Sequence, residues 1–201
     1  ALDIGSNDGV LSALVHLVTS DGSQMRPVEL RKSAMEILAG VTHTIAYWDS
    51  RIKSAGKSIE TMNESVLRLH EKLGIAITIL EDENAADYVM TAFSSPFDSL
   101  NTSRDSPASQ LKEVAALTLS ALSSFSVKMT KSIIARNILH TLISISMDDG
   151  FNSPSKRGGG RWSSRSLPML EAVASILVQS WKLIQNDAPN QKLQDEFGDG
   201  S

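Results

Sequence analysis

The stretch GVLSALVHLVTSDGSQMRPVELRKSAMEILAGVT, residues 9–42, indicates the fold of the whole chain. Its first part has apolar residues at spacings of three and four, which is the pattern of one helix face. These residues are Val10, Leu11, Leu14, Val15, Leu17 and Val18. Ser20, Asp21 and Gly22 then form a polar turn, and Pro27 suits the first turn of a second helix, where an amide donor is not needed. The stretch therefore predicts two amphipathic helices joined by a short turn.

The second helix of this pair has a predicted apolar face and a predicted charged face. The apolar face holds Leu30, Ala34, Ile37, Leu38 and Val41, and the charged face holds Glu29, Arg31, Lys32 and Glu36. Glycine lowers helix stability, so we expect the helix to close near Gly40.

Composition favours an all-α protein. Of the 201 residues 41% are hydrophobic but only 5% are aromatic, a balance that suits helices packed on helices. A formal net charge of −4 gives no electrostatic basis for binding nucleic acid. The chain has no cysteine, which excludes disulfides, thiol catalysis and cysteine-based metal sites. No apolar run is long enough for a membrane span.

The rest of the chain shows the same helical spacing, interrupted by polar stretches. Helical segments are expected at 43–52, 59–73, 84–93, 110–125, 133–147 and 170–184, and the run IAITIL at 75–80 is interpreted as helix. Flexible insertions are expected at 94–109 and 149–166, and a frayed tail at 190–201. The acids Glu81, Asp82 and Glu83 are interpreted as a solvated charge run. We expect a single domain over 1–201.

A small residue followed four positions later by a large aliphatic one recurs along the chain. The pairs are Ala34 and Leu38, Ala76 and Leu80, Ala115 and Leu119, and Ala172 and Ile176. The alanines are 42, 39 and 57 residues apart, and the last interval contains the predicted insertion at 149–166. A period near 40 residues is typical of helical solenoids.

These segments resemble the armadillo-repeat family and its HEAT relatives. The parts that resemble it are GVLSALVHLVTSDG with VELRKSAMEILAGV, and QLKEVAALTLSALSSF with ILHTLISISMDDG. The resemblance implies a right-handed α-solenoid that binds a peptide or a partner helix along a groove, without catalysis and without a cofactor. Nuclear-import members have a Trp and an Asn in the groove, where this chain has Glu36 and Gly40, and Leu117 and Ala121. Recognition of nuclear-localisation signals by that mechanism is therefore not expected.

Residues on the polar faces of the helices that line such a groove are the candidate contacts. They are Arg31, Met35, Lys112 and Thr118. The partner is expected to be another protein or a peptide, and the oligomeric state is left open. The first residues, ALDIGSND, have neither an initiator Met nor a signal-peptide pattern, so we expect a part of a longer intracellular protein, cytoplasmic or nuclear.

Two alternatives remain open. LDIGSNDG, residues 2–9, resembles the glycine-rich motif with which class I methyltransferases bind S-adenosylmethionine, but that fold requires several strands that the helical spacing does not predict. The third interpretation is an oligomerisation or autoinhibitory module within a longer protein.

Few residues form a pattern that is typical of metal binding or of modification. His16, His43, His70 and His140 are far apart in sequence and show no metal-binding spacing. In the segment 153–166, Ser153 precedes a proline and Ser164 follows Arg161 by three residues, so both are candidate phosphorylation sites. The simpler interpretation of this segment is an unmodified basic loop.

Overall fold

The computed structural model describes residues 8–19, 27–54, 63–93, 106–136, 140 and 166–197, and in the last range the side chains of 170–185. These residues form the helices α2 (Asp8–Leu17), α3 (Val28–Ser54), α4 (Glu64–Asp82), α5 (Ala85–Phe93), α6 (Pro107–Phe125), α7 (Val127–Ala135) and α9 (Ser166–Phe197). The described ranges contain no strand. This part of the chain is all-helical, as predicted.

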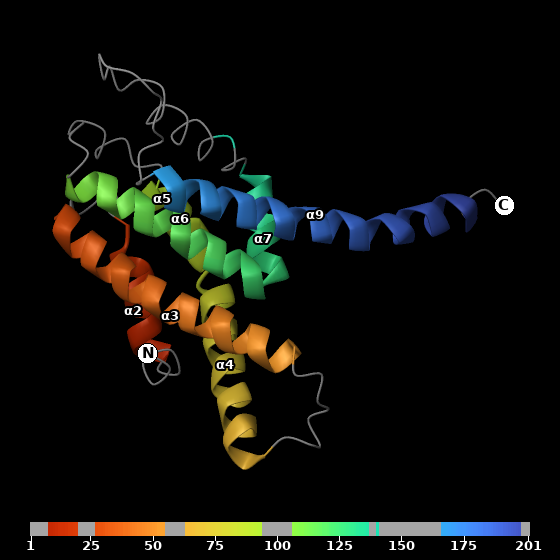
Figure 1. Cartoon of the computed structure of the whole chain (residues 1–201), viewed down its shortest axis with the longest axis horizontal. Helices are drawn as coiled ribbons and strands as arrows, with labels where there is room; N and C mark the ends of the chain where they lie inside the picture. The colour runs from red at the N-terminus through yellow and green to blue at the C-terminus, as the bar shows by residue number, and fades with distance from the viewer. Residues whose placement is uncertain are drawn as a thin grey trace.

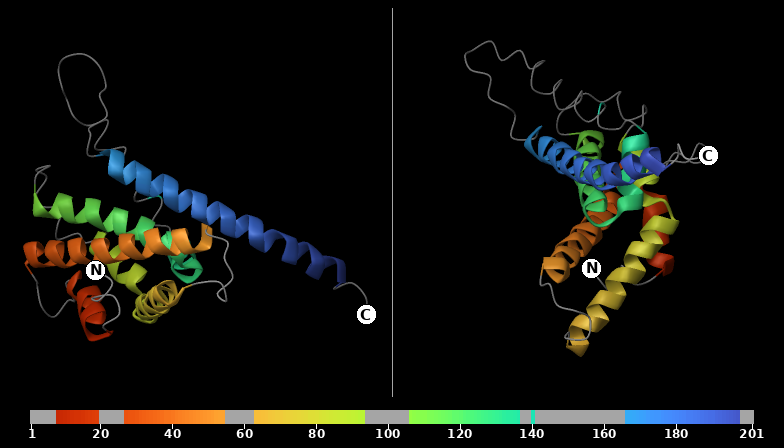
Figure 2. Two further views of the ribbon diagram at one scale, coloured as in Figure 1. Left: turned by 60° about the horizontal axis from the view of Figure 1, so that its bottom comes forward. Right: turned by 90° about the vertical axis from the view of Figure 1, so that its right-hand side faces the viewer.

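The helices are arranged in two rows. In one row α6 lies between α3 and α9 and packs against both (Figures 1 and 2). In the other row α5 packs against α2 and α7, and it also contacts α6. The remaining helix, α4, packs against α2, α3 and α5, and its N-terminal end points away from the other helices (Figure 1). The core therefore lies between the two rows, and α6 contacts helices of both rows.

The helix α3 does not end near Gly40, and that prediction is wrong. It has 27 residues in all, from Val28 to Ser54, and includes the segment expected as a separate helix at 43–52. A Cβ at Gly40 would have no neighbour within 4 Å, so the position is open rather than a close packing contact. Glycine costs a helix about 1 kcal/mol relative to alanine, whereas the burial of Val41 and Ile45 beyond it contributes more.

The small and large residues of the predicted repeat all lie in the core. Each alanine of the four pairs is buried, and so is its aliphatic partner four positions later. Small side chains at these positions let neighbouring helices approach while the large ones fill the space between them. The pairs on α3, α6 and α9 occupy one row, but Ala76 and Leu80 lie on α4, outside that row.

Local capping explains where several helices begin. The Asn63 side chain accepts a hydrogen bond from the Val66 amide at 3.0 Å and starts α4, which includes the run at 75–80, as predicted. Ser106 accepts from the Ser109 amide at 3.2 Å, so α6 begins inside the expected loop 94–109. Ser126 separates α6 from α7 and accepts from the Met129 amide at 3.2 Å.

Other boundaries differ from the predictions. The helix predicted at 133–147 begins earlier, at Val127, and its end lies outside the described residues. The same holds for most of the insertion at 149–166, including Ser153 and Ser164. The last helix begins at Ser166 and its backbone continues to Phe197, into the segment expected as a tail. Among the helices described here, none is both long and apolar enough to cross a membrane.

Candidate interaction site

Three of the four predicted contact residues are inside the protein. Arg31 is 3% exposed, and Met35 and Thr118 are fully buried. The Thr118 hydroxyl donates to the Val114 carbonyl oxygen at 2.8 Å, within its own helix. Only Lys112, half-buried on α6, has an accessible side chain. The expectation that these residues lie on exposed polar faces is therefore wrong for Arg31, Met35 and Thr118.

The buried Arg31 has a structural partner at the end of α2. Its Nε atom donates to the Val18 carbonyl oxygen at 3.2 Å. The last carbonyl groups of a helix lack partners within the helix, and a cationic donor is favoured there by the helix dipole. Arg31 thus joins α3 to the C-terminal end of α2, which explains why a charged residue faces the core.

The orientation of α3 that buries Arg31 also places predicted core residues at the surface. Leu30 and Ile37 are 46% and 47% exposed, although the sequence pattern predicts both on the apolar face that packs inward. Together with Thr44 and Trp48 they lie along one edge of the helix, at spacings of seven, seven and four residues. We call these four residues the α3 ridge.

An open position lies beside the α3 ridge. Ser33 and Gly40 are exposed next to it, and the space around the missing Cβ of Gly40 is empty to 4 Å. Near the end of the ridge, the ring of Tyr47 meets Trp48 edge to face, with the ring centroids 5.2 Å apart. The ridge therefore combines large apolar side chains with a gap at which another chain can approach the backbone closely.

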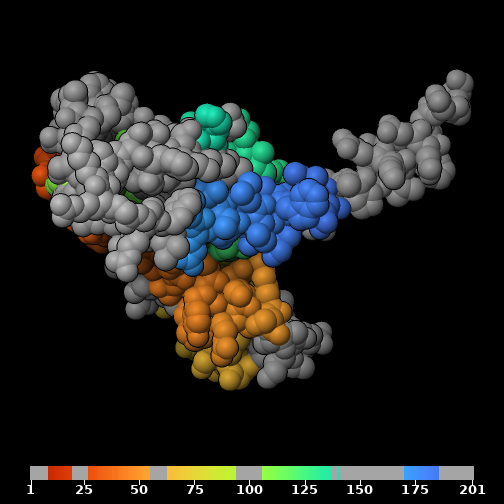
Figure 3. Space-filling model, turned by 45° about the horizontal axis from the view of Figure 1, so that its top comes forward, coloured from red at the N-terminus to blue at the C-terminus, as the bar shows by residue number. Residues whose placement is uncertain are grey.

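The helix α9 also has an exposed apolar side. Leu177, Val178, Trp181 and Ile184 are all largely exposed, while Ala172, Val173 and Ile176 are buried. Figure 3 shows a face of the molecule on which α3 and α9 both reach the surface. Scattered apolar residues are normal on protein surfaces, but rows of them along helices are typical of interaction sites.

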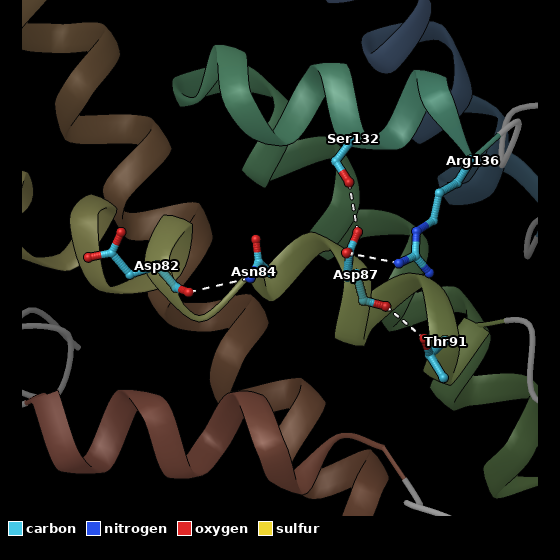
Figure 4. Close-up of polar contacts among 6 residues, drawn as sticks. All are labelled: Asp82, Asn84, Asp87, Thr91, Ser132 and Arg136. Atoms are coloured by element: carbon cyan, nitrogen blue, oxygen red, sulfur yellow. Dashed lines mark hydrogen bonds and ion pairs between the residues drawn. The ribbon is translucent and has the colours of Figure 1, made fainter.

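A polar network fixes the other row of helices. The carboxylate of Asp87 on α5 accepts from the Ser132 hydroxyl at 2.7 Å and from Arg136 Nη2 at 2.9 Å, both at α7 (Figure 4). The Asp87 carbonyl oxygen accepts from the Thr91 hydroxyl at 2.8 Å. Asn84, in the turn before α5, has a positive φ of 51°. All of these groups are used within the fold.

Of the three acids at the end of α4, Asp82 is exposed as predicted, but Glu81 and Glu83 are half-buried and bonded to other helices. The Ser126 hydroxyl donates to Glu81 Oε1 at 2.5 Å, and Lys128 Nζ donates to the Glu81 carbonyl oxygen at 3.0 Å. His16 Nε2 lies 3.1 Å from Glu83 Oε2, and its ring meets Tyr88 edge to face. The junction of α4 and α5 is thus connected to α2 and α7, and its polar groups stabilise the packing of that row.

The described residues form no cluster of metal-binding side chains. Nowhere in them do three or more His, Asp or Glu side chains come together in a way that would hold a metal ion. His16, His43 and His70 lie on three different helices, and His43 Nδ1 donates to the Ala39 carbonyl oxygen of its own helix at 2.8 Å. The α3 ridge and the exposed side of α9 are two rows of exposed apolar residues.

Comparisons with known proteins do not identify a family. No family model, curated protein or solved structure matches the chain. The armadillo resemblance therefore depends on the sequence pattern alone, and the function has to be argued from the surface of the chain itself.

Sequence reasoning missed the α3 ridge because the apolar stripe of α3 is too broad. Leu30 and Ile37 are a full two turns apart and lie at the edge of the stripe centred on Ala34, Val41 and Ile45. One signal was present in the sequence. A stripe this broad exceeds what one core contact covers, so part of it had to lie at an edge or under another chain.

Proposed function

We propose that this chain is a non-enzymatic interaction scaffold that binds an amphipathic helix or peptide of another protein on the α3 ridge. The proposed architecture is a short right-handed solenoid of the armadillo or HEAT type. No cofactor is required, and the proposed setting is intracellular, as part of a longer protein.

The packing order of the helices supports the solenoid. In a solenoid each helical unit stacks mainly on its neighbours, so equivalent helices form parallel rows. Here α3, α6 and α9 follow one another in one row and α2, α5 and α7 in the other. On this basis the units are α2 with α3, α5 with α6, and α7 with α9, and α4 is an addition to the second unit.

The observation that carries the proposed function is the exposure of the α3 ridge. A helix usually buries one apolar stripe, but α3 has a buried stripe and an exposed one. Burial of apolar surface contributes about 25 cal/mol per Å², so covering Leu30, Ile37 and Trp48 together would favour binding by several kcal/mol before the cost of association. An amphipathic helix that presents apolar residues every three to four positions matches such a ridge.

A selection from a peptide library tests this proposal. Peptides selected on the wild-type chain are expected to have amphipathic helical sequences and to perturb the NMR signals of the Ile37 methyl and the Trp48 indole. Ile37→Glu is expected to weaken their binding about tenfold or more, because it places a charge in an apolar contact.

The matched control lies on the same helix. Ser50 is exposed and lies away from the α3 ridge, so Ser50→Glu adds the same charge without touching the proposed contact. Equal affinity of the selected peptides for wild type and Ile37→Glu would overturn the proposal, and so would equal losses in both variants. Lys112 remains a predicted secondary contact, to be tested by Lys112→Glu.

S-adenosylmethionine binding is not proposed. The parallel sheet that a class I methyltransferase needs has no counterpart among the described helices, and all but the last two residues of LDIGSNDG lie outside the described ranges. Phosphorylation at Ser153 and Ser164 stays a prediction, because both residues are also outside those ranges.

A further inference from the structure

The two sides of α9 are used differently. Ala172, Val173, Ile176 and Ser180 are buried, where the helix packs on α6 and α7. Beside this packed side Leu177 is 45% exposed and Trp181 is 61% exposed, and Ile184, beyond the buried residues, is 58% exposed. The C-terminal end of α9 extends past every other helix (Figures 1 and 2), and no described residue buries these three side chains.

The outer side of α9 has the spacing of a helix-pairing seam. Leu170, Ala174, Leu177, Trp181 and Ile184 follow one another at intervals of four, three, four and three residues. This is the a and d spacing with which two helices pack along their lengths. Ala174, Leu177, Trp181 and Ile184 are exposed, and Leu170 is half-buried. We call these five residues the α9 seam.

The charges beside the α9 seam favour a second copy of the same helix. Between residues 170 and 185 the charged side chains are Glu171 and Lys182, both exposed and at opposite ends of the segment. In an antiparallel pair of identical helices, each Glu171 would lie near the partner's Lys182. A parallel pair would place the two Glu171 side chains, and likewise the two Lys182 side chains, on opposite flanks of the seam, so it would form no such contact.

We propose that α9 pairs antiparallel with α9 of a second copy of this chain, along the α9 seam and about a two-fold axis between Ala174 and Leu177. In this register Ala174 faces the partner's Leu177, and Leu170 faces the partner's Trp181. Glu171 lies about two residues, or roughly 3 Å along the axis, from the partner's Lys182. At the two-fold axis the small Ala174 then faces the large Leu177, which lets the helices approach closely there.

The length of the α9 seam limits the affinity of the proposed homodimer. The α9 seam extends over about 21 Å of helix, at 1.5 Å per residue. Two helices in contact over this length bury less than the roughly 800 Å² per partner of a standard interface. The homodimer is therefore expected to be in fast exchange, with a dissociation constant in the micromolar range.

Sedimentation equilibrium of the full chain over a concentration series measures this directly. Wild type is expected to change from monomer to dimer as concentration rises. Trp181→Asp is expected to raise the dissociation constant about tenfold or more, because a central aromatic anchor is lost and a charge is buried. Trp48→Asp on α3 is the matched control and is expected to leave the dimer intact, which separates this proposal from binding at the α3 ridge.

Charge variants test the antiparallel arrangement. Glu171→Lys and Lys182→Glu each put like charges together, so each alone is expected to weaken the dimer about twofold to fivefold. The double variant is expected to restore the wild-type affinity. All these residues are exposed, and circular dichroism of each variant checks that the helices are retained.

Orientation has an independent readout because the chain has no cysteine. In the variant Ile184→Cys, a parallel pair would place the two introduced thiols together and form a disulfide on oxidation, whereas the antiparallel pair separates them by about 25 Å and forms none. A wild-type chain that stays monomeric, a dimer unaffected by Trp181→Asp or by the single charge variants, or a disulfide-linked dimer of the Ile184→Cys variant would each overturn the proposal.

Discussion

Arg31 Nε donates a hydrogen bond to the carbonyl oxygen of Val18, and this contact joins α3 to the C-terminal end of α2. The arginine is almost fully buried, so its charge has exchanged water for a carbonyl group at a helix C-terminus. The pairing of α2 with α3 thus depends on a polar contact as well as on apolar packing.

Removing this donor is expected to destabilise the protein. Arg31→Met keeps much of the side-chain volume but leaves the Val18 carbonyl without its cationic donor, at a cost of about 1–3 kcal/mol in the free energy of unfolding. Urea denaturation followed by circular dichroism measures this loss. Arg51→Met, at an exposed position of the same helix, is expected to change stability by less than about 0.5 kcal/mol. A loss at Arg31 no larger than that at Arg51 would contradict the assigned role.

Arg31 also shows where the sequence was informative and where it was not. The spacing of apolar residues predicted the helical class correctly, because that spacing reflects which residues face a core. The rotation of α3 was predicted wrongly, because the rule that charged residues face water has an exception where a helix end offers unpaired carbonyl groups. Arg31 and Val18 are 13 residues apart in sequence, and no local pattern specifies their contact.

The length of α3 and the exposed side of α9 have a common explanation. Gly40 signals a break in an isolated helix, yet Val41, Thr42 and Ile45 beyond it are buried, so tertiary packing overrides the local preference. In α9, apolar residues occur on both sides of the helix, and the sequence alone does not distinguish which side packs on α6. The candidate surfaces therefore became visible only when burial was known.

The left-handed conformation of Asn84 leads to a second prediction. Its φ of 51° is costly for most side chains, by about 1–2 kcal/mol, but is tolerated by Asn and is unstrained for Gly. Asn84→Ala is therefore expected to lower the free energy of unfolding by about 1 kcal/mol, while Asn84→Gly leaves it nearly unchanged. Thermal and urea unfolding of the two variants measure the difference, and equal effects would show that the turn is not under this constraint.

The ion pair between Asp87 and Arg136 leads to a third prediction. Its Nη2 to Oδ2 distance is 2.9 Å, but both side chains are partly exposed, so solvent screens the attraction. A double-mutant cycle with Asp87→Ala and Arg136→Ala is expected to give a coupling energy of about 0.5–1 kcal/mol, decreasing at high salt. The exposed pair of Arg68 and Glu64 on α4 is the comparison and is expected to couple more weakly. A larger coupling there than at Asp87 would contradict this ranking.

The last prediction uses Gly40 and Gly74 to separate the stability of α3 from binding at its ridge. A Cβ at Gly40 or at Gly74 would meet nothing within 4 Å, and both positions are inside helices. Gly40→Ala and Gly74→Ala are therefore each expected to raise the free energy of unfolding by about 0.5–1 kcal/mol. Gly40 lies beside the α3 ridge and Gly74 lies on α4, so only Gly40→Ala is expected to weaken ridge-binding peptides, because its methyl group keeps them from the backbone. Isothermal titration with the same peptide on both variants measures this, and equal affinities would show that a partner does not use the gap at Gly40.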